Sequence, residues 1–75
     1  MNHTTEVVTE LTYDDYTVQA VYVRWAGGGE SYEFRVLDGA NGLVLYTSEN
    51  GYGQALPALA DAYQYLQQRG RRHAV

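Results

Sequence analysis

Two adjacent carboxylates, Asp14 and Asp15, are the residues of this sequence that could most directly do acid–base chemistry. Such chemistry needs carboxyl groups held at a fixed distance from the reacting atoms. Adjacent aspartates favour turns, where water solvates both side chains, so the pair indicates a structural turn rather than a catalytic site. Tyr13 and Tyr16 flank the pair and add aromatic area to its charge. This combination predicts a binding surface, because desolvated rings supply affinity while charges steer approach.

The other residue types that carry catalysis are missing or badly placed. The sequence has no cysteine, which excludes disulfides, thiolate metal sites and cysteine nucleophiles. No serine lies in a Gly-x-Ser-x-Gly setting. The two histidines, His3 and His73, lie near opposite ends of the chain, where a general base cannot hold its geometry. We therefore expect no catalytic residues, no metal site and no cofactor, although an enzyme stays open as a third class of function.

Three consecutive glycines, Gly27 to Gly29, have the composition of a phosphate-binding loop. Such a loop continues into Gly-Lys-Ser/Thr and the start of a helix, and neither follows here. Glu30 and Ser31 come next, so this stretch predicts the loop of a β-hairpin.

The net charge of −4 is unevenly distributed. Residues 1–50 carry eight acidic residues and two arginines, whereas residues 51–75 carry one aspartate and three arginines. An acidic body repels phosphate backbones and anionic membranes, so we expect no direct nucleic acid binding and no membrane association. It favours a protein partner that is basic or that normally binds nucleic acid. A simpler alternative stays open, in which the charge only keeps a small protein soluble.

The only basic cluster lies near the C-terminal end and consists of Arg69, Arg71, Arg72 and His73. A nucleic-acid-binding protein would combine such a cluster with a basic groove or exposed aromatic rings. Here the predicted sheet is acidic. We favour the interpretation that these residues interact with the negative end of a helix dipole.

Alternating apolar residues and turn signals predict four β-strands, at about residues 6–12, 17–26, 32–37 and 43–47. The second is apolar on both faces, which is typical of a central strand. Asn41-Gly42 between two apolar runs is a strong hairpin signal. The alternation of side chains along the second strand does not determine which of its two faces meets the helix. Either Tyr22 or Trp25 is therefore expected in the core, and Trp25 is favoured as a core anchor over an interface residue.

Helical periodicity follows at about residues 54–69. Five apolar residues form one predicted stripe: Leu56, Leu59, Ala60, Tyr63 and Leu66. Pro57 fits the first turn, and Gly70 fits the C′ position just after the helix. One helix on one face of an antiparallel four-stranded meander is a two-layer α+β domain. The expected core, besides Tyr22 or Trp25, comprises Phe34, Val36, Leu45, Leu56, Leu59, Tyr63 and Leu66.

Seventy-five residues make one domain at most, here residues 1–75, with a thin core. Chains of this size usually add disulfides, a metal or a partner subunit, so a homodimer is favoured. An acidic edge strand would oppose edge pairing, and the oligomeric state stays open. No apolar run approaches the roughly 18 residues that span a bilayer. Residues 1–10 lack the pattern of a signal peptide, so we expect a cytoplasmic location.

A series of short motifs precedes the Ala-rich helix: Phe34-Arg35-Val36-Leu37, Ala40-Asn41-Gly42, Leu43-Val44-Leu45, Ser48-Glu49 and Tyr52. In this order, over about residues 32–66, they resemble the YegP-like small domain family. That family runs through a strand, an Asn-Gly turn, a strand ending in Ser-Glu, a Gly/Tyr loop and a helix. The chain departs from it in the acidic first strand, the Gly27 to Gly29 loop and Pro57. The resemblance implies a β-meander followed by one helix, and it implies no activity for any residue.

In size, acidity and absence of cysteine the chain also resembles phage-encoded inhibitors of bacterial defence, the anti-CRISPR proteins among them. This resemblance implies a non-enzymatic, stoichiometric inhibitor of a host nucleic-acid-handling complex such as a CRISPR–Cas effector. The alternative is a YegP-like housekeeping domain of unknown ligand, acting as a self-associating structural or small-ligand-binding module. The residues expected to bind the protein partner are acids and tyrosines of the first hairpin and the third strand: Glu6, Glu10, Tyr13, Asp14, Asp15, Tyr16 and Glu33.

Overall fold

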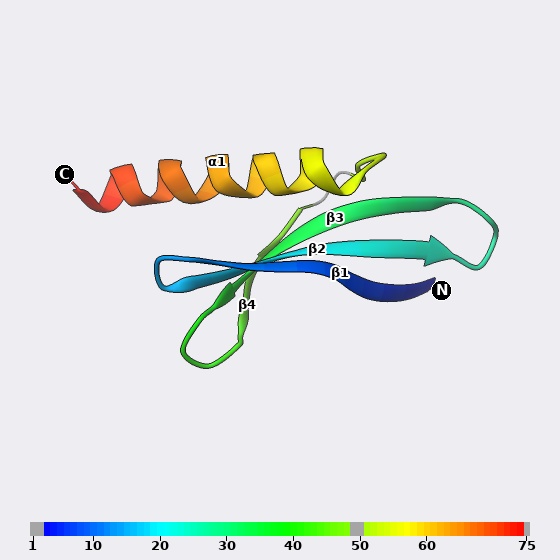
Figure 1. Ribbon diagram of the computed structural model, residues 1–75, viewed down its shortest axis with the longest axis horizontal. Coiled ribbons are helices and arrows are strands. Elements are labelled where there is room, and N and C mark those ends of the chain that lie inside the picture. Colours follow the sequence, from blue (N-terminus) through cyan, green and yellow to red (C-terminus); the bar gives the residue numbers. More distant parts are fainter. Residues whose placement is uncertain (1–2, 49–50, 75) are drawn as a thin grey trace.

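The computed structural model describes the backbone of residues 3–48 and 51–74, and the side chains of residues 3–48 and 51–69. Its elements are β1 (His3–Tyr13), β2 (Tyr16–Trp25), β3 (Glu30–Asp38), β4 (Val44–Thr47) and α1 (Ala55–Ala74). The strands pair antiparallel in the order β1-β2-β3-β4, and α1 lies along one face of the sheet (Figure 1). The predicted α+β fold is confirmed.

The first two connections are the tight turns that the sequence predicts. Asp14 has a φ of 53° in the turn between β1 and β2, a left-handed conformation that aspartate tolerates better than most residues. Gly28 and Gly29 have φ values of 91° and 107° in the loop between β2 and β3. The Trp25 amide closes that loop by donating to the Gly29 carbonyl at 3.0 Å.

The β3–β4 connection is a five-residue loop, residues 39–43, that contains the predicted Asn-Gly pair. Asp38 caps it, because its Oδ1 accepts a hydrogen bond from the Ala40 amide at 2.7 Å. Gly39 donates its amide to the Asp15 carbonyl at 2.8 Å, and a Cβ at Gly39 would lie 2.7 Å from that oxygen. The close approach requires glycine there and ties this loop to the β1–β2 turn.

The core lies between α1 and the two central strands. Its eight buried members are four sheet residues and four helix residues: Val18, Ala20, Phe34, Val36, Ala58, Leu59, Ala62 and Leu66. Phe34, Val36, Leu59 and Leu66 are thus in the core as predicted. Because Ala58 and Ala62 are fully buried, the helix backbone approaches the sheet closely at these positions.

The helix is rotated relative to the predicted stripe, and two of the expected core residues, Leu56 and Leu45, are exposed. Leu56 is 75% exposed and Ala60 is exposed, because the buried stripe runs through the small residues Ala58 and Ala62 instead. Leu45 is also exposed, since the register between β3 and β4 shifts at this point and Leu45 has no cross-strand partner. Tyr63 is half-buried, with its ring edge-on to Tyr13 at 5.3 Å.

Trp25 is not a core anchor, and its side chain is 46% exposed. Since Val18 and Ala20 contact α1, the alternation of β2 places Tyr22 on the helix side and Trp25 on the opposite side. Tyr22 is half-buried. Parity allowed either arrangement, and the docking of the helix decides between them.

The predicted C-terminal end of the helix is also wrong. The helix α1 continues through Gly70 to Ala74, so Gly70 is not the C′ residue. Glycine inside a helix costs about 1 kcal/mol relative to alanine, and its arginine neighbours are good helix formers. The side chains of Arg71, Arg72 and His73 lie outside the described part of the chain, so the structure does not place the predicted basic cluster.

Candidate functional site

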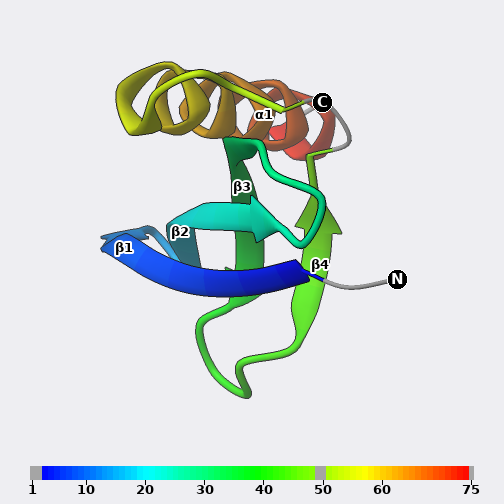
Figure 2. The ribbon, with the colours of Figure 1, turned by 90° about the vertical axis from the view of Figure 1, so that its right-hand side faces the viewer.

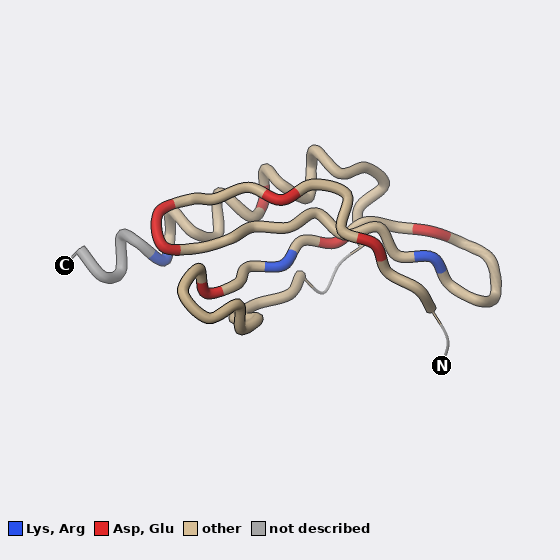
Figure 3. Tube along the Cα trace, turned by 60° about the horizontal axis from the view of Figure 1, so that its bottom comes forward, with Lys and Arg blue, Asp and Glu red and all other residues tan. Residues whose placement is uncertain are grey.

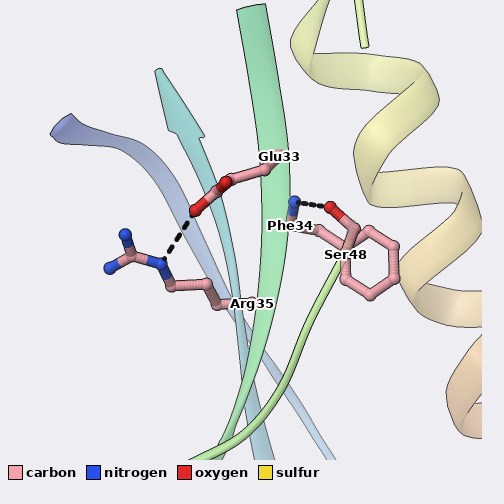
Figure 4. Close-up of polar contacts among 4 residues, drawn as sticks. All are labelled: Glu33, Phe34, Arg35 and Ser48. Atoms are coloured by element: carbon pink, nitrogen blue, oxygen red, sulfur yellow. Dashed lines mark hydrogen bonds and ion pairs between the residues drawn. The ribbon is translucent and has the colours of Figure 1, made fainter. Parts of the chain in front are cut away.

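The face of the sheet that α1 does not cover is called the open face below. On β3, the Phe34 ring points toward α1 near Ser48, whereas Glu33 and Arg35 point away from the helix (Figure 4). On β2, the residues with the same parity as Glu33 include Val21, Val23 and Trp25. The open face therefore carries both apolar and charged side chains.

An apolar strip runs along β2 on the open face. Val21 and Val23 are buried although they lie on the face of the sheet opposite α1. The cross-strand neighbours of Val21 are Val7 and Glu33, and the sheet is so strongly twisted that β1 and β2 cross β4 steeply (Figure 2). At the end of the strip the Trp25 ring lies 4.9 Å from the His3 ring, tilted by 43°. Trp25, which is 46% exposed, is thus the exposed end of a strip whose other two members, Val21 and Val23, are buried.

Two ordered carboxylates lie on the same face. Glu33 forms an ion pair with Arg35 at 3.3 Å. Glu10 accepts a hydrogen bond from the Gln19 amide group at 2.8 Å, and the register of β1 and β2 places this pair on the open face. Both contacts hold the carboxylates in place without neutralising the acidic character of the sheet as a whole.

The remaining five predicted binding residues lie elsewhere. Glu6 is opposite Tyr22 in the register, and it therefore faces the helix side of the sheet. Tyr13 and Tyr16 also face that side and are half-buried against the core. The pKa of Arg69 is raised, mainly by a hydrogen bond with Tyr16 and next by the nearby Tyr65. The two tyrosines therefore pack within the fold and do not join Glu10 and Glu33 on one surface.

Asp14 and Asp15 are exposed at the tip of the first hairpin, between the two faces. They border a shallow hollow of about 680 Å³ together with Asp38 and Gly39. Within residues 3–48 and 51–69 no group of three or more histidine, aspartate or glutamate side chains could hold a metal ion. Asp14 and Asp15 thus contribute negative charge at the tip of the first hairpin.

The sheet and its turns, residues 3–47, carry seven acidic residues and two arginines. The acidic positions spread over both β1–β2 and β3–β4 hairpins (Figure 3). They are Glu6, Glu10, Asp14, Asp15, Glu30, Glu33 and Asp38. A basic partner that approaches the sheet from the open side therefore meets an attractive field.

A second site, called the tyrosine pocket, lies on the helix side and was missed by sequence reasoning. Its volume is about 400 Å³, and its rings are Tyr46, Tyr52 and Tyr65. The Tyr52 hydroxyl donates to Asp61 Oδ2 at 2.6 Å; this hydrogen bond and partial burial raise the pKa of Tyr52 to about 12. The available signals were the excess of tyrosine and the helical spacing of Asp61 and Tyr65.

In the part of the chain that the structure describes, no helix is both long and apolar enough to cross a membrane. No protein-family model, no curated protein and no solved structure matches this chain.

Proposed function

We propose that this protein is a non-enzymatic binding protein that inhibits a host nucleic-acid-handling complex, such as a CRISPR–Cas effector, by covering a basic surface of that complex. The observation that carries the proposal is the half-exposed Trp25 on the open face, beside the buried Val21 and Val23. Tryptophan is enriched among the residues that dominate protein interfaces.

The charge of the sheet supports a basic partner. Glu10 and Glu33 lie on the open face, and Asp14 and Asp15 extend the negative charge to the hairpin tip. Charges of this kind accelerate association and select against acidic partners, while affinity comes from the apolar contacts. A surface that normally binds a phosphate backbone is complementary to such a face, and its occupation would exclude the nucleic acid.

The proposal is tested by adding the purified protein to purified CRISPR–Cas effectors and following their target DNA binding in a gel-shift assay. We expect at least one effector to lose DNA binding at a one-to-one ratio, with the inhibition weakening as salt is raised. An effector panel that binds DNA normally at a large excess of the protein would refute the proposal.

A second candidate function follows from β4. Leu43, Val44 and Leu45 are exposed, and β4 is an edge strand with its outer side unpaired within the described residues. An apolar edge strand is a template for pairing with another chain. This observation favours a self-associating housekeeping module of the YegP-like kind, in which a second copy covers β4.

A further inference from the structure

The tyrosine pocket opens on the helix side of the sheet, between α1 and the chain that leaves β4. Its rings are Tyr46, Tyr52 and Tyr65, and its polar side chains from α1 are Asp61, Gln64 and Gln68. Phe34, which is buried, forms part of its lining and lies between 5.6 and 6.5 Å from each of the three rings. The pocket is thus separate from the open face, and its walls rest on the core.

Two of the pocket's rings pack against each other. The Tyr46 and Tyr65 rings are stacked with centroids 4.3 Å apart and planes inclined by 14°, so one face of each ring is covered by the other. The face of a tyrosine ring attracts a cation, and a planar cation gains further contact by stacking on it. The outer faces of this stacked pair and the Tyr52 ring are the surfaces that suit a flat, positively charged group.

The polar side of the pocket offers hydrogen-bond acceptors and one negative charge. Asp61, Gln64 and Gln68 follow one another along one side of α1 at helical spacing. Asp61 Oδ2 accepts from Tyr52, while among the described hydrogen bonds Asp61 Oδ1 and both glutamine side chains have no partner. The nearest arginine in sequence, Arg69, is not among the lining residues and donates to the Tyr65 hydroxyl at 3.3 Å.

These features select one ligand chemistry. Among the described residues no cationic side chain lines the pocket, whereas the Asp61 carboxylate does, so these residues favour a cation over an anion, and none of them forms a metal-holding cluster. An ammonium group is compact and cannot stack, whereas a guanidinium group is planar, carries five donors and has no acceptor. We infer that the tyrosine pocket binds a guanidinium group, either of a free small molecule or of an arginine side chain on a partner.

The Tyr52–Asp61 hydrogen bond prepares the pocket for such a ligand. With its pKa raised to about 12, Tyr52 stays protonated at neutral pH and keeps donating to Asp61 Oδ2. This contact fixes the carboxylate at the mouth of the pocket with Oδ1 still able to accept from a guanidinium donor.

The test is a titration of the full chain, labelled with ¹⁵N, followed by its backbone amide resonances. The probes are methylguanidinium, a short arginine peptide and the same peptide with lysine. We expect methylguanidinium and the arginine peptide to shift the amides of Asp61, Gln64 and Tyr65 saturably, with Kd on the order of 1 mM, as suits a ligand of few atoms. The lysine peptide should bind at least about tenfold more weakly, because it cannot stack.

Two variants make the test specific. Asp61→Asn should weaken binding by about tenfold or more, because it removes the negative charge while keeping the shape of the side chain. Asp15→Asn, which removes an exposed charge at the hairpin tip, should bind as wild type. Circular dichroism spectra like those of the wild type would show that both variants fold.

The outcomes separate the sources of the ligand. Equal affinity for methylguanidinium and the arginine peptide assigns the pocket to a free guanidinium compound, and clearly tighter peptide binding assigns it to an arginine of a partner. Equal binding of the lysine peptide, unchanged binding by Asp61→Asn, or no saturable shift would overturn the inference. Trp25→Ala should leave the titration unchanged, so failure here is distinct from failure of the open face as an interface.

Discussion

Trp25 and Leu56 are two large apolar side chains that remain in water, and their surroundings differ. Trp25 lies at the end of β2 beside the His3 ring, on the strand that also carries the buried Val21 and Val23. Leu56 lies in the first turn of α1 and is 75% exposed. A single exposed leucine is common on protein surfaces, whereas tryptophan is enriched at protein interfaces, and we propose Trp25 as such an interface residue. The two residues therefore form a matched pair for mutagenesis.

The Tyr52–Asp61 hydrogen bond predicts a specific pH dependence. Because the folded pKa of about 12 exceeds the unfolded value of 10.0, the protonated phenol favours the folded state. The stability that it contributes is fully present below pH 10 and is lost as the pH rises toward 12. Tyrosinate absorbance, measured for the wild type and for Tyr52→Phe, gives the titration of Tyr52 by difference. A difference curve centred near the ordinary pKa of about 10 would contradict the structure.

At the scale of elements, the contact between α1 and the sheet decides what the rest of the surface offers. The helix docks through the alanines Ala58 and Ala62 together with Leu59 and Leu66. This orientation leaves Leu56 outside and brings Asp61 and Tyr65 next to Tyr52 and Tyr46. The rotation of one helix thus forms the tyrosine pocket.

The helix orientation is tested by two leucine truncations. Leu59→Ala should lower the free energy of unfolding by about 2–5 kcal/mol, because it leaves a cavity in the core. Leu56→Ala should change it by less than about 0.5 kcal/mol, because that side chain is in water. Urea unfolding followed by circular dichroism measures both. Similar losses for the two variants would show that the helix presents a different stripe to the sheet.

The elements were predictable from sequence because their signals are local. Gly27 to Gly29 and Asn41-Gly42 specify hairpins within a few residues, and the change to helical periodicity marks α1. The predicted helix stripe is wrong because apolar periodicity favours large residues such as Leu56. The buried stripe runs instead through alanines, which allow the helix to approach the sheet closely. The exposure of Trp25 and the formation of the tyrosine pocket depend on where α1 docks, which is a long-range property that parity and periodicity do not determine.

At the scale of the whole molecule, the two edges of the sheet differ in character. β1 is eleven residues long, carries Glu6 and Glu10, and shifts register between Val7 and Thr9. Charges and bulges of this kind discourage pairing with another chain. β4 is four residues long and uncharged, and Leu43 just before it is 63% exposed. The β4 edge is therefore where a second copy would pair.

Light scattering at micromolar concentration measures this directly. If β4 pairs with a second copy, the mass is twice 8.4 kDa, and Leu45→Lys lowers it to that of the single chain. The lysine places a charge on the exposed β4 segment without touching the core, so the variant should fold normally. A wild-type mass of 8.4 kDa would exclude the dimer and with it the self-associating module as a function.

The binding kinetics of Trp25→Ala toward a purified CRISPR–Cas effector, beside those of Leu56→Ala, test the central claim most directly. The wild type and Leu56→Ala should bind with the same affinity. Trp25→Ala should bind at least about 30-fold more weakly, mainly through faster dissociation, as for an interface residue worth about 2 kcal/mol or more. If no effector in the panel binds the wild type, or if Trp25→Ala binds as tightly as Leu56→Ala, the open face is not the interface that we propose.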